Sequence, residues 1–390
     1  MNKTGTRLPF GIPRDLGILA VTVFIWGLGE GLFIYFYPLA LQRWNIESLQ
    51  IGAILSILGI IMALVQAPAG YLSDRFGTRP LIRAALILGV IGAGMMAAAK
   101  SLPSFILGLI AYTLTSFIGA PLNSYITSMR GNWSAQRGIT FISGSMQLGA
   151  IVGPMLGGWI AQTAGFSTVF RYSAGLFLIA TVIVFFARRP VAQQDEQEST
   201  TQNVKTLANP RFLGVLAIIF FTIIALSTPQ QLTSMYLQNV HHLSLQQIGI
   251  TGTFAGIGTA AILFAFGNLQ APVGMIAGQL IIGLFSLLMW RGQNAAMFYF
   301  GYLFIGGYRM YHSMAVAAVR PLVKASEVGL AYGLVETCNA LAVILAPLAA
   351  GFLFNYKPES VYTISLIALA VTIVLTTRWY RQGARAMKYN

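Results

Sequence analysis

The sequence predicts an all-α membrane protein with twelve transmembrane helices. Of its 390 residues, 56% are hydrophobic and 9% are charged, whereas an ordinary soluble domain has roughly 25% charged residues. The chain contains twelve apolar runs, each of which is long enough to cross a hydrocarbon core of ~30 Å as a helix. These runs lack the alternating pattern of a transmembrane β-barrel.

The twelve runs follow one another with short polar connections. The predicted spans are residues 16–41, 49–72, 80–98, 103–127, 138–163, 168–187, 212–237, 246–266, 272–290, 295–319, 327–353 and 359–377. The first run is too long for the core of a cleavable signal peptide and contains Glu30, so we expect it to be a retained helix. The single cysteine, Cys338, excludes an intramolecular disulfide.

The net charge of +14 is explained by topology. With a cytoplasmic N-terminus, eighteen of the 24 basic residues fall on the cytoplasmic side and Arg309 falls within a helix. The five on the other side are Arg43, Lys100, Arg171, Arg291 and Lys357. This positive-inside bias predicts a multi-pass protein of the cell (inner or plasma) membrane with both termini cytoplasmic. We expect the bilayer, not nucleic acid, to be the partner of the basic residues.

The chain divides into two similar halves. The longest polar stretch, residues 188–211, contains QQDEQESTTQ and predicts a cytoplasmic linker between domains 1–187 and 212–390. A shift of 197 residues places QIG at 50–52 on QIG at 247–249, at the start of the second helix of each half. GPMLGG at 153–158 has a weaker counterpart in APLAAG at 346–351. Together with the match of 70–77 on 267–274, which lies between them in the chain, they indicate an internal repeat.

One polar stretch differs between the halves. The same shift places GYLSDRFG at 70–77 on GNLQAPVG at 267–274. Both glycines and the leucine match, but Asp74 and Arg75 correspond to Ala271 and Pro272. The backbone geometry is therefore predicted to be shared, whereas the charges belong to the first half.

GYLSDRFGTRP at 70–80 resembles the signature of the loop between helices 2 and 3 in the major facilitator superfamily. With the twelve spans, the six-plus-six repeat and the linker, the resemblance covers essentially the whole chain. It implies a secondary transporter, not an enzyme, with two pseudo-symmetric six-helix domains around a central cavity. A small-molecule substrate, no cofactor and a monomeric state are expected.

The resemblance also implies a gating role for this loop. Asp74 is expected to face the positive N-terminal end of helix 11, with Arg75 and Arg79 paired nearby at the cytoplasmic domain interface. Gly70 and Gly77 are expected to let backbones approach closely. The alternative is a solvated loop that obeys the positive-inside rule, which explains the arginines but not the spacing of glycine, aspartate and proline.

A second stretch, GAIVGPMLGG at 149–158, resembles a fifth-helix pattern of the superfamily's antiporters. Its matching residues are Gly149, Gly153, Pro154, Gly157 and Gly158. Small residues at this spacing pack helices closely in any membrane bundle, and the proline bends its own helix. Pure packing and a hinge or antiport-related role both remain open.

Ionisable residues at membrane depth are functional candidates because burying them in the bilayer is costly. Three stand out: Glu30, Arg309 and Glu336, in the first, tenth and eleventh spans. Arg309 and Glu336 both lie ~15 Å from the cytoplasmic ends of their helices at about 1.5 Å per residue, so we expect a structural or gating pair. An alternative is that Arg309 binds an anionic substrate.

Glu30 lies near the membrane midplane and is the predicted proton-titrating or cation-recognising residue. The residues expected on its helical face are Trp26, Gly27, Phe33, Ile34 and Tyr37. A carboxyl group among aromatic side chains suits proton uptake and release. The alternative is a carboxyl group that is merely hydrogen-bonded by a neighbouring helix.

Further polar groups lie on the helices that the resemblance places around the cavity. They are Asn123, Tyr125, Gln147, Gln230, Gln231, Tyr308, Tyr311, His312 and Asn339. For each, interhelical hydrogen bonding is an alternative to ligand contact. His241 and His242 are followed by no carboxylate or cysteine at metal-ligand spacing, so no metal site is expected.

The sequence contains no phosphate-binding loop, nucleophile elbow, zinc-protease motif or catalytic triad, which disfavours an ATP-driven pump. Two carboxyl groups and one guanidinium at membrane depth favour a cation, or a neutral molecule with a proton. We therefore favour proton-coupled export of a hydrophobic or amphipathic compound. One departure is that the superfamily's proton-linked drug exporters usually have an arginine within the fourth helix, whereas 103–127 contains no charged residue. A sugar or metabolite symporter, a lipid or lysolipid transporter, and a channel or receptor are the alternatives.

Overall fold

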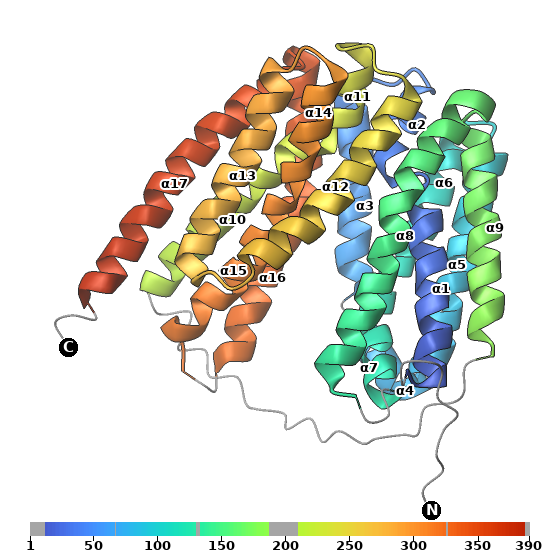
Figure 1. Ribbon diagram of the computed structural model, residues 1–390, viewed down its shortest axis with the longest axis horizontal. Coiled ribbons are helices and arrows are strands. Elements are labelled where there is room, and N and C mark those ends of the chain that lie inside the picture. Colours follow the sequence, from blue (N-terminus) through green and yellow to red (C-terminus); the bar gives the residue numbers. More distant parts are fainter. Residues whose placement is uncertain (1–11, 67, 130–132, 187–209, 325–326, 387–390) are drawn as a thin grey trace, which may run out of the picture. The chain divides into compact units, whose positions relative to one another are not determined.

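The computed structural model is helical and describes residues 12–66, 68–129, 133–186, 210–324 and 327–386 (Figure 1). The chain forms two compact units. Unit 1 comprises Met1–Trp44, Ile60–Glu196 and Ser244–Thr253, and unit 2 comprises Asn45–Gly59, Gln197–Leu243 and Phe254–Asn390. The chain thus passes from one unit to the other within two helices, α3 (Ser48–Gln66) and α12 (Leu245–Phe266).

The remaining helices each belong to one unit. Those of unit 1 are α1 (Arg14–Gly31), α2 (Tyr37–Gln42), α4 (Ala69–Phe76), α5 (Thr78–Ala98), α6 (Leu102–Thr113), α7 (Gly119–Met129), α8 (Ala135–Ala164) and α9 (Phe166–Val184), with 3-10 turns η2 (Ile34–Phe36) and η3 (Leu114–Ile118). Those of unit 2 are α10 (Pro210–Gln231), α11 (Thr233–Asn239), α13 (Ala271–Arg291), α14 (Ala295–Tyr302), α15 (Gly307–Val319), α16 (Val328–Tyr356) and α17 (Ser360–Ala386), with η5 (Leu303–Gly306) and η6 (Arg320–Leu322).

The predicted spans are present as helices. Among the described residues, eleven helical segments are long and apolar enough to cross a membrane. The predicted span 295–319 is not one of them, although α14, η5 and α15 make it helical throughout. It is the segment that carries Arg309 and His312. The protein is therefore a multi-pass all-α membrane protein.

The internal repeat is visible in the backbone. Asn45 and His242, which are 197 positions apart, both have φ of 54° and are the only non-glycine residues with positive φ in the described part of the chain. Five positions later in each copy, the side chains of Gln50 and Gln247 accept a hydrogen bond of 2.9 Å from the backbone N–H three residues earlier. The turn and the helix start that follows it are thus built in the same way twice.

Within unit 1, the start of α12 crosses α8 with backbone against backbone. A methyl group on Gly249 would overlap the carbonyl oxygen of Pro154 and lie 3.0 Å from Cα of Gly158. The Leu245 N–H donates to Oε1 of Gln162 at 3.0 Å. Only glycine permits this approach, and close contact of small residues is a main source of helix association in membranes.

Within unit 2, the start of α3 crosses α16 in the corresponding way. A methyl group on Gly52 would overlap the Pro347 carbonyl oxygen and lie 3.1 Å from Cα of Gly351. Pro347 and Gly351 occupy the places in APLAAG that Pro154 and Gly158 occupy in GPMLGG. The weaker sequence match therefore reflects a repeated helix crossing.

Helix α8 packs on α1 through three glycines at intervals of four residues, Gly149, Gly153 and Gly157. A Cβ at Gly153 would lie 2.6 Å from Cα of Gly31, and one at Gly157 would overlap the carbonyl oxygen of Leu32. Figure 1 shows α8 and α1 side by side along most of their length. The packing role of the fifth-span glycines is thus present in the structure.

We predict that Gly157→Ala destabilises the protein by about 1–3 kcal/mol, because the added methyl group forces α8 away from α1. The thermal unfolding temperature of the purified protein in detergent measures the effect. Gly144→Ala is the matched control in the same helix, since a methyl group there meets no atom within 4 Å and alanine favours helix by up to about 1 kcal/mol. Equal unfolding temperatures for the two variants would contradict the prediction.

Candidate functional site

The carboxyl group of Glu30 lies one residue before the end of α1, where the helix changes into the 3-10 turn η2. Glu30 is half-buried, and its side chain is hydrogen-bonded to the hydroxyl group of Tyr112, which projects from α6. Tyr37, at the start of α2, is close enough to interact electrostatically with the same carboxylate. Three helices of unit 1 therefore meet at this acid.

An aromatic cluster surrounds the Glu30–Tyr112 pair. The ring of Phe177 stacks on Trp26 with 4.2 Å between centroids and on Tyr112 with 5.8 Å. Phe33 contacts Tyr112 edge-on at 5.1 Å and Tyr37 at 5.3 Å. These rings come from α1, α2, α6, α9 and the turn after α1, so the acid is held within a well-packed apolar surround.

Glycines make room for these rings. A methyl group on Gly92 of α5 would lie 2.6 Å from the backbone nitrogen of Tyr112, and one on Gly29 would lie 2.8 Å from the Phe177 ring. A methyl group on Gly89 would overlap the indole of Trp26. The position of the tyrosine hydroxyl therefore depends on small residues in the neighbouring helices.

Most of the predicted neighbours of Glu30 lie in this region. Trp26 and Tyr37 belong to the aromatic cluster. Ile34 lies in the 3-10 turn after α1, where the 3.6-residue periodicity ends, and its side chain is 41% exposed. The sequence did not identify Tyr112.

The remaining polar candidates of unit 1 differ in environment. Asn123 is exposed on α7, and its backbone carbonyl accepts the hydroxyl of Thr127 at 2.8 Å. Gln147 is half-buried on α8, whereas Tyr125 is fully buried on α7. Tyr125 is therefore a packing residue.

In unit 2, polar side chains join α15 and α16. The hydroxyl of Tyr308 donates to Oδ1 of Asn339 at 2.6 Å. One helical turn further on, Nε2 of His312 lies 3.3 Å from Oε2 of Glu336, close enough for an ion pair when the imidazole is protonated. Residues 308 and 312 lie on one face of α15 because they are four positions apart.

The predicted Arg309–Glu336 pair is wrong. Glu336 faces His312, and Arg309 is exposed. Arg309 follows Tyr308 by one residue, which rotates its side chain by about 100° away from the face that contacts α16. The side chain that faces Glu336 from α15 is thus His312.

Three other polar candidates of unit 2 lie in its core or bond within their own helix. Tyr311 is fully buried in the core of unit 2, where its hydroxyl lies beside Thr222 of α10. The amide of Gln230 donates to the carbonyl of Leu226 in its own helix at 2.8 Å, and that of Gln231 to Ser227 at 3.3 Å.

The charged stretch at 70–80 forms the short helix α4 and the start of α5. Gly77 joins them with φ of 80°. A methyl group there would meet no atom within 4 Å, so the expectation that Gly77 allows close backbone approach is wrong. The residue is needed because its backbone is left-handed. The side chain of Asp74 and its expected contact with helix 11 lie outside the described part of the structure.

The arginines of this stretch have partners within unit 1. Arg75 donates to the hydroxyl of Tyr71 at 3.2 Å. Arg79 donates to the backbone carbonyl of Phe185 at 3.2 Å, and the guanidinium of Arg83 lies 4.0 Å from the Phe185 ring centroid. Phe185 caps the C-terminal end of α9, where cations are stabilising. The beginning of α5 is thereby attached to the end of α9.

His241 lies in the connection between α11 and α12. Its ring contacts Tyr236 at 4.9 Å and Phe298 at 4.5 Å between centroids. Burial lowers the pKa of His241, and this exceeds the opposing effect of Glu359, while His242 lowers it further. In the described ranges, no group of three or more histidine, cysteine, aspartate or glutamate side chains is placed to hold a metal ion.

Two helical units, each with polar side chains at membrane depth, define the protein as a membrane transporter. Residues 19–274 and 270–390 match the sequence profile of the Major Facilitator Superfamily, and the chain belongs to this superfamily. Its members move solutes by secondary transport, so the protein is a transporter of small molecules and not an enzyme.

Two similar proteins cover nearly the whole chain. Multidrug resistance protein 1 of Bacillus subtilis is 22% identical over 374 residues, which are 93% of this chain and 96% of that protein. Quinolone resistance protein NorA of Staphylococcus aureus is 22% identical over 94% of this chain and 97% of its own.

Two solved structures, both of mutant proteins, share the fold. That of a peptide transporter, POT, superimposes with a TM-score of 0.79 at 14% identity, covering 97% of this chain and 96% of the other. That of a nucleoside transporter, NupG, has a TM-score of 0.78 at 15% identity, with 94% and 99% covered.

We predict that Tyr112→Phe moves the pH dependence of transport upward by about one to two pH units. The phenylalanine keeps the ring packing but removes a donor that stabilises the ionised carboxylate, and a hydrogen bond to a charged group contributes about 1.5–3 kcal/mol. Transport in vesicles between pH 5 and 9 measures the shift. Tyr362→Phe is the control, because it removes a buried tyrosine hydroxyl that donates to Thr233 at 3.1 Å in unit 2. A shift of the same size in the control would contradict the prediction.

We predict that the protein loses stability as the pH falls below about 6.5, partly through His241. Its folded-state pKa is lower than the ordinary value of 6.5, so the unfolded chain binds more protons in this range and acid favours unfolding. Thermal unfolding in detergent between pH 8 and 5 tests this. His241→Phe is expected to flatten the dependence, whereas His242→Asn, which tolerates positive φ, should retain it. An unchanged slope in His241→Phe would contradict the assignment.

Proposed function

We propose that the protein exports a hydrophobic or amphipathic organic compound in exchange for protons, with Glu30 as the proton-binding residue. The observation that carries this proposal is the half-buried carboxyl group of Glu30, hydrogen-bonded to Tyr112 and surrounded by packed aromatic rings. Such a group exchanges a proton with a large change in its interactions with the surroundings. This change is what couples proton binding to a conformational equilibrium.

The names of the similar proteins support this direction of transport. Multidrug resistance protein 1 and quinolone resistance protein NorA, according to their names, confer resistance to several drugs and to quinolones. Their similarity extends over nearly the whole chain, so we assign an amphipathic substrate of the same general chemistry. The aromatic side chains beside Glu30 suit such a substrate, because rings contact apolar and cationic groups alike.

The other polar groups receive supporting roles in the proposal. His312 and Glu336 are proposed to take the gating role that the sequence assigned to Arg309 and Glu336, since they lie 3.3 Å apart and connect α15 with α16. Asn123, Gln147 and the Tyr308–Asn339 pair are proposed to provide hydrogen-bonding groups to the substrate pathway.

Topology and gating complete the proposal. The protein is proposed to act as a monomer in the cell membrane. The distribution of the basic residues supports the proposal that both termini are cytoplasmic. The stretch with Asp74, Arg75 and Arg79 is proposed to stabilise the inward-closed state. The crossing of α8 at Pro154 and Gly158 is proposed to act as a hinge in addition to its packing role.

We predict that Glu30→Gln abolishes substrate-dependent proton movement. The experiment uses everted membrane vesicles that are acidified by respiration and contain an internal pH dye, to which organic cations, sugars and lysolipids are added in turn. A transported compound should collapse the pH gradient with the native protein, whereas Glu30→Gln vesicles should respond like vesicles without the protein. Glu30→Asp, which retains an acid, should keep part of the response.

Glu47→Gln serves as the control for loss of a carboxylate, because Glu47 is exposed in the connection before α3. It should behave as the native protein does. If Glu30→Gln retained the full response, the proton role of Glu30 would be excluded. A response to sugars alone, or to lysolipids alone, would replace drug export by the corresponding transport of metabolites or lipids.

A further inference from the structure

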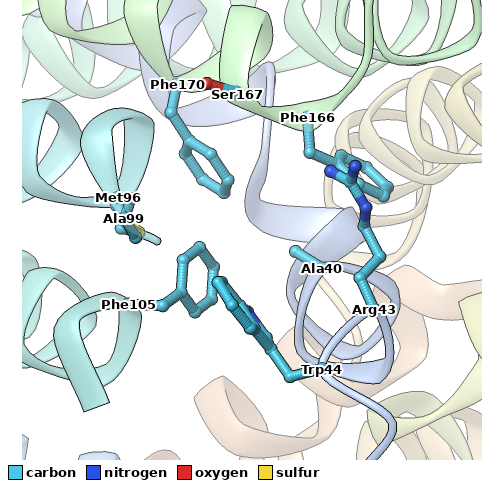
Figure 2. A pocket seen from close by; sticks show the side chains of 9 residues that line it. All are labelled: Ala40, Arg43, Trp44, Met96, Ala99, Phe105, Phe166, Ser167 and Phe170. Atoms are coloured by element: carbon cyan, nitrogen blue, oxygen red, sulfur yellow. The ribbon is translucent and has the colours of Figure 1, made fainter. Parts of the chain in front are cut away.

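A cavity of about 240 Å³ lies within unit 1, where α2 and α5 end and α6 and α9 begin (Figure 2). Its principal walls are Arg43, Trp44, Met96, Phe105, Phe166 and Phe170. This end of unit 1 is opposite the start of α1 and is the predicted external end. The cavity is lined by other residues than those around Glu30, and its lining ring Phe170 lies 5.6 Å from Phe33 of the aromatic cluster.

The walls are aromatic. Phe105 packs on Phe170 at 5.5 Å and on Trp44 at 6.2 Å between ring centroids. Figure 2 shows these rings converging on the cavity from the loop after α2, from α6 and from α9. A partly open space with such walls favours a slender apolar group, and at about 240 Å³ it is smaller than the roughly 300–1,000 Å³ of sites for drug-sized ligands.

One charged group lies at the edge of this apolar space. The guanidinium of Arg43 lies 5.3 Å from the centroid of the Phe166 ring, and the side chain is exposed. Figure 2 shows it lying against that ring. A guanidinium placed on an aromatic face keeps its donors available, and its planar fork matches a carboxylate or a phosphate.

The charge around the cavity runs against the general distribution. Of the five basic residues that the sequence places on the external side, three lie here: Arg43 lines the cavity, and Lys100 and Arg171 directly follow the lining residues Ala99 and Phe170. The nearest acid along the chain, Glu47, belongs to unit 2. Basic residues are otherwise rare on the external side of this protein. Three of them close together therefore favour an anionic partner.

We propose that this cavity, the Arg43 pocket, binds an anionic amphiphile. One acyl chain lies among the rings of Phe105, Phe166 and Phe170, and the carboxylate or phosphate headgroup lies on Arg43. Trp44 is a residue type that favours the membrane interface, which is the depth at which such a headgroup is found. The ligand is either a free fatty acid or an anionic phospholipid of the surrounding bilayer, and both present the same chemistry.

Quenching of Trp44 fluorescence by brominated acyl chains tests the proposal, because bromine quenches indole fluorescence at contact. The full-length protein is reconstituted in nanodiscs of unlabelled phosphatidylcholine, and the Trp44 signal is obtained by subtracting that of Trp44→Phe. Three probes are added separately: brominated fatty acid, brominated phosphatidylglycerol and brominated phosphatidylcholine. We expect saturable quenching by one or both anionic probes and only weak, non-saturating quenching by phosphatidylcholine.

Arg43→Gln should weaken the apparent affinity for the anionic probe by roughly tenfold or more, as expected when a charge-assisted hydrogen bond is lost. Arg43→Lys keeps the charge and should show a smaller loss. Arg291→Gln is the matched control, because Arg291 lies over Trp290 at 4.3 Å in unit 2; it should leave the Trp44 signal unchanged. Glu30→Gln should also bind normally, which separates this site from the transport mechanism.

The probes distinguish the sources of the ligand. Quenching by fatty acid alone identifies a free carboxylate amphiphile, and quenching by phosphatidylglycerol identifies a bilayer lipid. Equal quenching by all three probes, unaffected by Arg43→Gln, would show that the bilayer contacts Trp44 without a built site and would overturn the proposal. If Arg43→Gln does not fold, the proposal is tested on the native protein and on Arg43→Lys. Stronger Trp44 quenching by the anionic probes than by brominated phosphatidylcholine supports it, and equal quenching overturns it.

Discussion

The arrangement of unit 1 depends on the cost of keeping the carboxyl group of Glu30 at membrane depth. A group of this kind needs a partner whose position is fixed, because a poorly held donor would leave it unsatisfied in apolar surroundings. The partner is the Tyr112 hydroxyl, and the tyrosine is fixed by stacking on Phe177 and by the absence of a side chain at Gly92. Ring packing and glycine placement therefore serve one polar contact.

The second constraint is the close approach of helix backbones. Without water between helices, association depends on van der Waals contact, which requires small residues where the axes cross. The structure uses the same solution twice, with Gly249 on Pro154 and Gly52 on Pro347. In both places the contact is formed by the start of a helix whose remainder belongs to the other unit. Two of the points where the chain passes from one unit to the other thus lie within the helices α3 and α12.

The sequence was sufficient for the features that depend on composition and repetition. Hydropathy identified the helices, the shift of 197 residues identified equivalent turns, and the cost of a membrane charge identified Glu30. Tyr112 could not be found in this way, because the register between two helices is set by side-chain shape and leaves no periodic signal. The available indication of a polar partner was that Tyr112 lies in the fourth span, which lacks the arginine usual in the superfamily's drug exporters.

Similar depth along two helices was also insufficient to identify a pair. Arg309 and His312 are both near the level of Glu336, and the choice between them depends on the rotation of α15, which a count of residues from the helix end does not supply. In the same way, the sequence identified Gly77 as part of the motif, but it did not show that the residue is needed for its positive φ. Whether a glycine serves close packing or positive φ is determined by the backbone around it.

The two halves differ most where the first half is charged. In unit 1 the helix α4 precedes Gly77, and Arg79 and Arg83 bind the end of α9 at Phe185. In unit 2 the corresponding stretch is a turn followed by α13, which begins at Ala271 with Pro272 in its first turn.

The residues that correspond to Arg79 and Arg83 are Ile276 and Leu280, which have no donor for a helix C-terminal carbonyl. Among the residues that the structure describes, attachment of the third span to the end of the sixth by arginines is therefore seen in unit 1.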